Sequence, residues 1–435
     1  MIKEKEPIFA LATPKSRSAL AVFRVSGKLS HKIIKKISTK KKWTNNKSSL
    51  NYLLDHKKEK IDKTLTTFFK GPQSYTGEDM VEISCHGGRS IIKEISLRLI
   101  GLGMRVAERG EFTRRALENN KIDLVQAEAI GDLVDANTDK QRELALSGLQ
   151  GKLKNFSNET SKKIKELLAN VEAIIDFSDE ELPHNLKKTI KEQRKNIILY
   201  LEKAIKDFEL GRSIREGFVV SVVGKTNTGK SSFVNYVSGR DVSIVTNVPG
   251  TTTDVVESLI EINGFQIRFL DTAGFRKHKN RVEEIGIKKA IEASTKSDIN
   301  LVFLKKNEKK LYKKTNKKIF VRSKYDVLKN KKPEKDKEIT DISSISGHGV
   351  DRLLRQIIKK LTKGHVFEPP VVSRERHVLK LEKCLQNIRC FNLDKNIDMA
   401  ADDLRLALRE IQEIHHKFDI DEILDIIFND FCIGK

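Results

Sequence analysis

Cysteine is scarce in this sequence, with four residues in a chain of 435, and no Cys-x-x-Cys or Cys/His pairing has the spacing of a zinc site. Four cysteines are too few for a disulfide framework, so a small disulfide-stapled protein is excluded. Long apolar runs are also missing: none approaches the ~20 residues of a membrane-spanning helix, and the N-terminus lacks the apolar stretch of a secretory signal. We therefore expect a cytoplasmic protein with no membrane partner.

Acidic residues are outnumbered, because 60 aspartates and glutamates face 83 lysines and arginines and leave a net charge of +23. Lysine-rich stretches such as 57–63 and 305–337 contain few aromatic residues. They are equally compatible with a solvated lysine surface, favoured by AT-rich coding, and with a nucleic-acid patch. The charge alone therefore identifies no partner.

The sequence pattern changes along the chain, whose length allows about three domains at ~150 residues each. Residues 1–118 mix short β-like runs with glycine and proline, residues 119–215 have the apolar spacing of helices, and residues 216–364 alternate strand-like and helical runs. Helical spacing returns at 365–435. We expect an α/β plus α+β multidomain protein: an N-terminal α+β domain, and a helical domain of two chain segments with an α/β domain inserted between them.

A phosphate-binding motif opens the α/β block. The buried-strand run FVVSVV is followed by Gly224 to Ser231 (GKTNTGKS) and then by a helical run. This is the Walker A pattern in its strand–loop–helix context, where glycines let backbone amides surround the phosphates and the helix N-terminus adds partial positive charge. Lys230 is expected to reach the β- and γ-phosphates and Ser231 to ligate Mg²⁺. The motif predicts a Ras-like P-loop G domain.

Two further segments follow in the order that a GTPase needs. The run Pro249 to Thr252 (PGTT) offers a threonine to complete the Mg²⁺ shell. A hairpin signature at Asn263-Gly264 leads to Asp271 to Gly274 (DTAG), where an aspartate holds Mg²⁺ through water and a glycine amide meets the γ-phosphate. Ras-like GTPases carry a water-orienting glutamine next, but this chain has Phe275. Glu283 is the candidate carboxylate for that task, with a solvated helix acid as the alternative.

A guanine-binding loop is predicted at Ser323 to Asp326 (SKYD), in the place of the Asn-Lys-x-Asp motif. Asp326 can accept hydrogen bonds from the N1–H and N2–H₂ groups of guanine, which adenine does not offer. Because Ser323 replaces the usual asparagine, one base contact is expected to be shortened or mediated by water. The run Ser343 to Ile345 would cover the other edge of the base.

Together these residues resemble the MnmE (TrmE) family of tRNA modification GTPases. The resemblance covers almost the whole chain, and its C-terminal run is specific because it lies at the chain end. The matching runs outside the nucleotide motifs are Ala12-Thr13-Pro14, Phe23-Arg24-Val25-Ser26-Gly27, SYTGEDMVEISCHGG, RGEFTRRALENNKIDLVQAEAI, IDFSDEE, GRSIREG and Phe431-Cys432-Ile433-Gly434-Lys435.

The resemblance implies an N-terminal domain that dimerises and binds a tetrahydrofolate derivative, either 5-formyl- or methylene-tetrahydrofolate. It implies a homodimer that joins MnmG in a heterotetramer, with FAD supplied by MnmG. The two proteins would add an aminomethyl or carboxymethylaminomethyl group at carbon 5 of the wobble uridine of certain tRNAs. G-domain dimerisation activated by K⁺ would promote GTP hydrolysis, because the ion supplies positive charge where an arginine finger otherwise acts.

The resemblance also assigns site residues one by one. Tetrahydrofolate would be bound by Arg24, Glu82, Lys121 and Lys435, with Cys432 beside them as a candidate functional thiol. Mg²⁺ would be held by Ser231 and Thr252, K⁺ by Asn227, Thr246, Val248 and Thr251, and the attacking water by Glu283 through a second water. The residues expected around GTP are Asn227, Thr228, Gly229, Lys230, Ser231, Ser232, Thr246, Asn247, Val248, Pro249, Gly250, Thr251, Thr252, Asp271, Thr272, Ala273, Gly274, Ser323, Lys324, Tyr325, Asp326, Ser343, Ser344 and Ile345.

Three substitutions depart from the family pattern: Thr226 stands for a proline, Thr253 for an arginine and Ser323 for an asparagine. Two other functions share the nucleotide motifs. A ribosome-assembly switch related to Era and Der explains neither the folate-type motifs nor the FCIGK end. A nucleotide-binding scaffold without hydrolysis conflicts with the intact Lys230 and Ser231. The leading hypothesis is therefore a GTPase of tRNA wobble-uridine modification.

Overall fold

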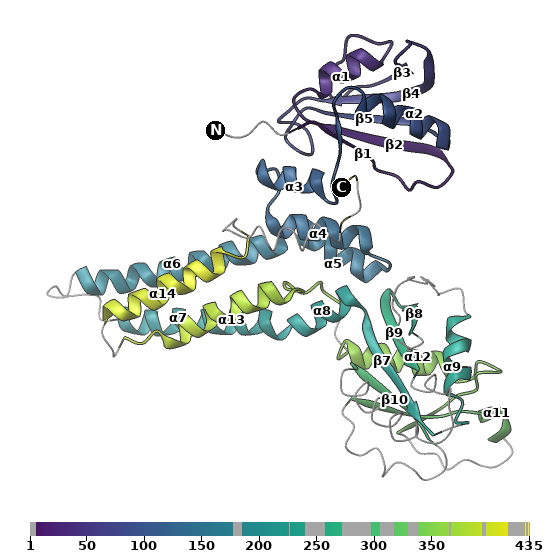
Figure 1. Ribbon diagram of the computed structural model, residues 1–435. Helices are drawn as coiled ribbons and strands as arrows, with labels where there is room; N and C mark the ends of the chain where they lie inside the picture. The colour runs from purple at the N-terminus through teal and green to yellow at the C-terminus, as the bar shows by residue number, and fades with distance from the viewer. Residues whose placement is uncertain are drawn as a thin grey trace, which may run out of the picture. The chain divides into compact units, whose positions relative to one another are not determined.

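The structure is a computed structural model of the chain, and it divides into two compact units (Figure 1). Unit 1 comprises Met1–Gly131 and His415–Lys435, and unit 2 comprises Asp132–Ile414. The C-terminal residues therefore belong with the N-terminal ones. The residues that the structure describes are 6–176, 185–225, 227–239, 257–271, 297–304, 317–328, 338–364, 367–393, 397–415, 431 and 434.

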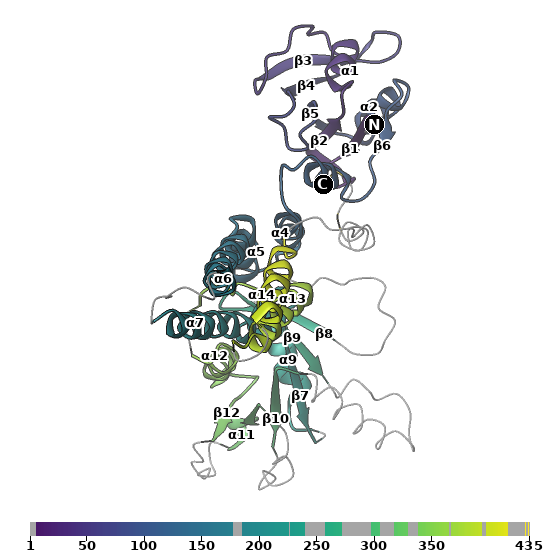
Figure 2. The same cartoon turned by 90° about the vertical axis from the view of Figure 1, so that its left-hand side faces the viewer.

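The described residues of unit 1 form a six-stranded sheet and four helices. Their bounds are β1 Ile8–Leu11, β2 Ser18–Ser26, α1 Ser30–Ile37, β3 Ser48–Leu54, β4 Lys60–Phe69, β5 Met80–Gly87, α2 Arg89–Ile100, β6 Arg105–Val106, α3 Glu111–Glu118 and α4 Leu124–Asp135, the last of which continues into unit 2. The strand order is β3-β4-β5-β2-β1-β6, antiparallel throughout except for the parallel pair β1 and β6. Helices α1 and α2 pack on the same face of the sheet (Figure 2).

The alternation of residues along β2 explains why this sheet has one buried face. Ala21, Phe23 and Val25 are almost completely buried and pack with the isoleucines of α1, whereas Leu20 is 62% exposed. Each buried side chain of the size of Val or Phe contributes about 1.5–3 kcal/mol. Arg24, which lies between two of the buried residues, is placed on the opposite face of the sheet.

The chain end returns to a small apolar cluster in unit 1. Phe431 packs with Leu117 of α3 and with Leu124 and Ala127 of α4. Gly131 is needed there, because a Cβ at that position would lie 2.9 Å from the Phe431 ring. This packing fixes the position from which the chain continues to Gly434.

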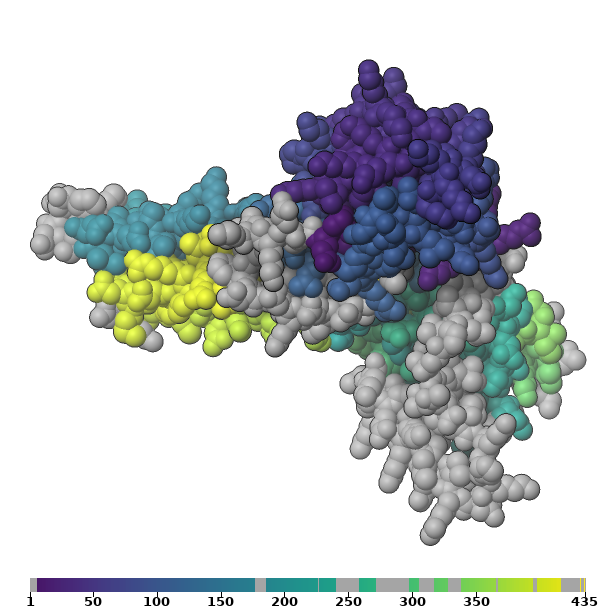
Figure 3. Space-filling model, turned by 45° about the horizontal axis from the view of Figure 1, so that its top comes forward, coloured from purple at the N-terminus to yellow at the C-terminus, as the bar shows by residue number. Residues whose placement is uncertain are grey.

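Unit 2 contains helices that precede its sheet in the sequence and helices that follow it. Their bounds are α5 Asp139–Leu149, α6 Lys152–Asp176, α7 Leu186–Lys206, α8 Phe208–Glu216, α13 Glu375–Cys390 and α14 Ile397–Gln412. Helix α14 lies along α6, as the adjoining teal and yellow surfaces of Figure 3 show. Ser157 Oγ of α6 donates to Ile411 O of α14 at 2.8 Å. Arg194 of α7 donates to Ile388 O of α13 at 3.0 Å. Helices distant in the sequence therefore pack together.

The sheet of unit 2 has the order β12-β11-β10-β7-β9-β8 and is parallel except for β8. Phe233 of its core contacts two other rings, with centroids 5.8 Å from Phe269 and 5.6 Å from Phe303. The bounds of this part are β7 Phe218–Gly224, α9 Lys230–Ser238, β8 Glu257–Ile262, β9 Phe265–Asp271, β10 Ile299–Phe303, β11 Lys318–Arg322, α11 Tyr325–Leu328, β12 Ile339–Asp341 and α12 Val350–Leu361. The predicted hairpin at Asn263-Gly264 is confirmed as the turn between β8 and β9.

The N-terminus of α5 joins the helices to this sheet. Thr138 and Gln141 form a capping box, which satisfies free amides of the first helical turn. Gln141 Nε2 also donates to Arg215 O at 3.1 Å and to Gln266 Oε1 at 2.5 Å. Lys140 N donates to Gly264 O in the hairpin turn at 3.0 Å. One helix end therefore holds both the end of α8 and the β8–β9 hairpin.

Candidate functional site: a phosphate loop with a base loop, and a charged pair at the chain end

The phosphate loop begins at the carboxyl end of β7 and leads into α9. Strand β10 is paired with β7 beside the start of the loop. Gly224 has φ +146°, and a Cβ there would lie 2.4 Å from Phe303 O, so only glycine fits where the loop begins. Asn227 and Gly229 follow with φ of 59° and 87°, the left-handed conformations that recur in anion-binding loops. The loop therefore has the backbone form that surrounds phosphate groups.

Lys230 is the first residue of α9 and points back into this loop. Its side chain is 7% exposed, and Nζ donates to Gly224 O at 2.8 Å and to Lys225 O at 2.7 Å. Thr228 Oγ1 donates to the same Lys225 carbonyl at 2.7 Å. Ser231 follows in the first helical turn and is exposed. The predicted lysine and serine thus lie at the helix N-terminus, where anions are favoured.

The base loop follows β11 and is attached to the phosphate loop. Ser323 Oγ donates to Thr228 O at 2.5 Å. Gly229 lies so close that a Cβ on it would be 2.4 Å from Ser323 Oγ. Ser323, which stands in the asparagine position, therefore holds two loops together that are 95 residues apart in the sequence.

Asp326 of the base loop is held by the loop that follows β12. Its Oδ1 accepts a hydrogen bond from Ser343 Oγ at 2.6 Å. Ser343 is buried, and its hydroxyl oxygen also accepts from Ile345 N and Ser346 N at 3.3 and 3.2 Å. The ring of Tyr325 stacks on His348 with the centroids 4.4 Å apart. The predicted base-contacting residues from β11 and β12 are thus brought together.

These loops meet at one edge of the sheet because parallel strands end on the same side. Asp271 is the last residue of β9 and is paired with Val222 of the neighbouring β7. Beyond the central strand, β10 lies on the side opposite to β9, so the chain connections diverge at β7. Crevices at the carboxyl ends of strands near such a divergence are the usual ligand sites of open α/β sheets.

In unit 1, two predicted folate residues form an ion pair. Arg24 of β2 and Glu82 of β5 lie directly opposite each other, with Nε and Oε1 2.9 Å apart. Arg24 Nη1 donates to Gly434 O at 3.3 Å, and its guanidinium carbon lies 5.8 Å from the centre of the Tyr75 ring. The chain end is therefore adjacent to the pair. The side chains are 26% and 33% exposed, so the pair is accessible to a ligand.

Lys121 lies against the loop that contains Tyr75. Gly77 in this loop has φ +77°, and a Cβ there would approach Lys121 Cγ to 3.2 Å and Asn119 Cβ to 3.1 Å. Asn119 Nδ2 donates to Thr76 O at 2.6 Å. This loop thus borders both Lys121 and, through Tyr75, Arg24.

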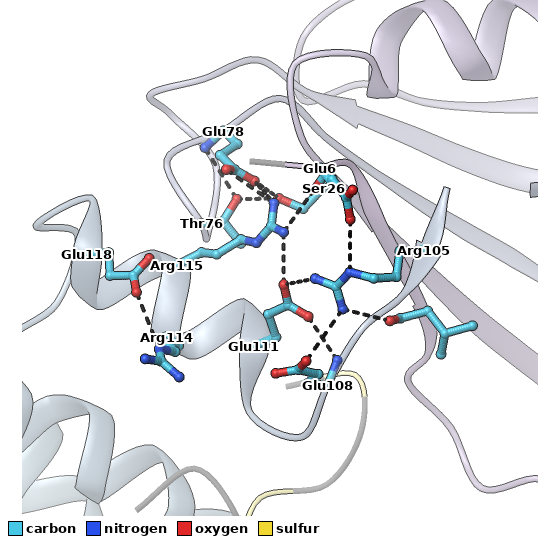
Figure 4. Close-up of polar contacts among 11 residues, drawn as sticks. Glu6, Ser26, Thr76, Glu78, Arg105, Glu108, Glu111, Arg114, Arg115 and Glu118 are labelled. Carbon is cyan, nitrogen blue, oxygen red and sulfur yellow. Dashed lines mark hydrogen bonds and ion pairs between the residues drawn. The ribbon is translucent and has the colours of Figure 1, made fainter. Parts of the chain in front are cut away.

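A buried charge network holds the same loop against α3 (Figure 4). Arg115 is 3% exposed and donates from Nη1 to Glu78 Oε2 at 3.0 Å and from Nη2 to Glu111 Oε1 at 2.8 Å. Arg105 Nη2 donates to the same Glu111 oxygen at 2.6 Å, and Ser26 Oγ donates to Glu78 at 2.7 Å. The sequence alone does not distinguish these residues as part of a site, although Glu78 lies in SYTGED and Arg115 in RGEFTRRAL. The network explains why both runs are charged.

Glu111 shows the balance of forces in the network. Burial raises the pKa of its carboxyl group, but hydrogen bonds from Arg105, the Glu108 amide and Arg115 outweigh burial, so the pKa is lowered from 4.5. The carboxylate is therefore ionised at neutral pH and compensates the two arginines.

Comparison with protein families assigns both parts of the chain. Residues 7–121 match the family described as GTP-binding protein TrmE N-terminus, and residues 124–432 match the MnmE helical domain. The chain belongs to the MnmE family.

Curated MnmE proteins match this chain from end to end. The tRNA modification GTPase MnmE of Pelagibacter ubique is 38% identical, over 98% of this chain and 100% of that protein. The MnmE of Orientia tsutsugamushi is 35% identical, over 98% and 99%. The MnmE of Aquifex aeolicus is 34% identical, over 99% and 100%. These matches favour the tRNA modification GTPase over the ribosome-assembly switch.

Part of the predicted MnmE site lies outside the described residues. This holds for the catalytic candidate and for most of the metal and loop ligands: Thr246, Asn247, Val248, Pro249, Gly250, Thr251, Thr252, Thr272, Ala273, Gly274, Glu283, Cys432 and Lys435. Within the described part of the chain, no helix is both long and apolar enough to span a bilayer.

Proposed function

We propose that this chain hydrolyses GTP as part of the modification of tRNA wobble uridines. The observation that carries the proposal is the end-to-end match to MnmE proteins, which are named tRNA modification GTPases. The matched chain also has a phosphate loop, with Lys230 directed into it, next to a base loop that contains Asp326. Both features are what binding of a guanine nucleotide requires.

The nucleotide would lie across these two loops. The α9 N-terminus and the loop amides would bind the phosphates, and Lys230 would exchange its carbonyl partners for β- and γ-phosphate oxygens. Asp326, oriented by Ser343, would accept the two N–H groups of guanine. Ser231 at the first helical turn fits a Mg²⁺ ligand, and Thr252 would complete that shell. Bound Mg²⁺ neutralises charge that develops on the phosphates.

Activation by K⁺ is part of the proposal. Asn227 is exposed at a left-handed position of the phosphate loop, so its side chain is available to an ion beside the phosphates. Thr246, Val248 and Thr251 would supply the remaining oxygens, and Glu283 would orient the attacking water. The ion would add positive charge where an arginine finger otherwise acts.

A tetrahydrofolate derivative is the proposed ligand of unit 1. Glu82 supplies a carboxylate that suits the donor edge of a pterin, and Arg24 and Lys121 supply cations for the anionic parts of a folate. The carbonyl of Gly434 lies within 3.3 Å of Arg24, which supports a role for the adjacent Lys435 and Cys432 in the same site. The 5-formyl and methylene forms share the pterin and glutamate groups.

The proposal extends to the assembly. A homodimer that joins MnmG, with FAD bound by MnmG, would carry out the uridine chemistry in the cytoplasm. A G domain at 216–364, inserted between helical segments at 119–215 and 365–435, would follow an N-terminal domain at 1–118. The contacts of α6 with α14 and of α7 with α13 support one helical domain from two segments.

Two experiments test the proposal at different levels. Mass spectrometry of tRNA from cells that lack the protein should show wobble uridines without the C5 group, and normal uridines would refute the tRNA role. GTP hydrolysis by the purified protein should be faster in K⁺ than in Na⁺, and Asn227→Ala should erase that difference. Equal rates of the unmodified protein in both salts would refute the K⁺ mechanism while leaving the tRNA role standing.

A further inference from the structure

An uninterrupted lysine-rich segment lies in unit 1, away from the residues assigned so far. From Lys28 to Leu54 the chain has eight lysines and no aspartate or glutamate. The segment contains α1, the loop after it and the edge strand β3. The absence of acidic residues distinguishes it from helix α7, which is also rich in lysine but includes Glu192 and Glu202.

Helix α1 separates its apolar and basic residues. Its three isoleucines are at most 5% exposed and pack into the core of the sheet. Lys32, Lys35 and Lys36 lie on the opposite, exposed side of the helix. Lysines near a helix C-terminus are favoured by the helix dipole, but this effect acts within the last turn and does not account for the lysines of the following loop.

The loop after α1 is fixed against β3, which makes the lysines one surface. Lys41 Nζ donates to Lys35 O and Ser38 O at 2.7 and 2.9 Å, and so caps the carbonyl end of α1. Lys40 Nζ donates to Ser49 Oγ of β3 at 2.5 Å. Thr39 pairs with β3 through its amide. We call Lys32, Lys35, Lys36, Lys40, Lys42 and Lys47 the α1 lysine surface.

Within the described residues, the lysines of the α1 lysine surface take part in no ion pair: Lys32, Lys35, Lys36, Lys42 and Lys47 have no acidic partner there. Burial lowers the pKa of the neighbouring His31 most, the charges of Lys35 and Lys70 lower it further, and the charge of Asp79 opposes them. Side chains on a fixed backbone that share one sign of charge form a standing positive potential.

We infer that the α1 lysine surface binds the phosphate backbone of tRNA. Phosphate contacts from lysines position an RNA without specifying its sequence, which fits a surface made of lysines. RNA is favoured over a membrane because a membrane-binding helix inserts its apolar face, and the isoleucines of α1 are already buried in the core. The identity of the RNA rests on the proposed function.

The test compares two triple variants of the full chain with the same loss of charge. One is Lys35→Gln, Lys36→Gln and Lys42→Gln on the α1 lysine surface. The matched control is Lys188→Gln, Lys191→Gln and Lys195→Gln, three exposed positions of α7. Binding of unmodified tRNA is measured by fluorescence anisotropy between 50 and 200 mM KCl, with GTP hydrolysis as the check that each variant is folded.

Removal of three phosphate contacts should lower the slope of log K against log salt by about 2 to 3 and weaken binding about ten- to hundredfold at 100 mM salt. The salt slope and the tRNA affinity of the α7 control variant should change far less. Equal losses in both variants, or none in the first, would overturn the inference. So would loss of binding to phosphatidylserine vesicles with tRNA binding unchanged. If the unmodified protein binds no tRNA at all, the inference fails, whereas the proposed function is tested separately by mass spectrometry of tRNA from cells that lack the protein.

Discussion

Ser323 is the sharpest test of how this nucleotide site differs from the usual Asn-Lys-x-Asp arrangement. Its hydroxyl donates to Thr228 O of the phosphate loop at 2.5 Å. An asparagine in this place has a longer side chain with an amide donor that can also reach N7 of a purine. We therefore expect Ser323 to keep the attachment between the two loops and to give up a direct contact with the base.

The magnitude follows from one neutral hydrogen bond, which contributes about 0.5–1.5 kcal/mol net. Ser323→Ala should weaken GTP and GDP alike by about two- to tenfold, because both nucleotides need the ordered phosphate loop. Ser323→Asn should restore the attachment and add a contact to N7, which GTP and ITP share. Affinity should then rise by a similar factor for both. The ratio of GTP to ITP affinity should stay unchanged in both variants, because the proposed partner of N2–H₂ is Asp326 rather than Ser323.

The assay is displacement of a fluorescent GDP analogue by GTP, GDP and ITP from each variant, with the thermal unfolding midpoint as the folding control. Unchanged affinity in Ser323→Ala would refute the attachment between the loops. A change in the GTP-to-ITP ratio would instead place Ser323 at the guanine N2 edge and refute its assignment to the phosphate loop.

Four further outcomes follow from described contacts. Asp326→Asn should weaken GTP about a hundredfold and favour XTP, whose 2-oxo group accepts from an amide, as nucleotide competition would show. Arg115→Met should lower the free energy of unfolding by about 3–5 kcal/mol in chemical denaturation, since it leaves the largely buried Glu78 carboxylate without its arginine and Glu111 with Arg105 alone. Arg114→Met, which removes the more exposed pair with Glu118, should cost less than about 1 kcal/mol. Because the folded pKa of Glu111 is lowered, its stabilisation is present above pH 4.5 and is lost as pH falls through the folded pKa; Glu111→Gln should reduce stability at pH 7 and flatten this acid dependence.

The nucleotide loops were predictable because their signals are local. The strand run before Gly224, the helix from Lys230 and the turn at Asn263-Gly264 are each set by a few neighbouring residues, and all three are present in the structure. The meeting of the phosphate and base loops also follows from a simple rule, since parallel strands end on one edge of a sheet.

The charged contacts of unit 1 were not predictable in the same way. Arg115 stands in a helix of mixed charge, where pattern analysis assigns an exposed side chain, yet it is 3% exposed. Its burial depends on Glu78, which is 37 residues away. The contact of Arg24 with Gly434 spans 410 residues. Such contacts depend on the folded arrangement of the whole unit, and no local period encodes them.

The N-terminal end of α5 connects the helices of unit 2 to the sheet, and the strands of the sheet lead to the nucleotide loops. Gln141 bonds to Arg215 O, just before β7, and to Gln266, near the start of β9. The same two strands end at Gly224 and Asp271, where the phosphate loop and the DTAG segment begin. Each strand has seven residues at about 3.3 Å per residue, so the N-terminal end of α5 lies about 20 Å from these loops. Because β7 and β9 are hydrogen-bonded to each other along this length, α5 is connected to both loops by paired strands rather than by a flexible linker.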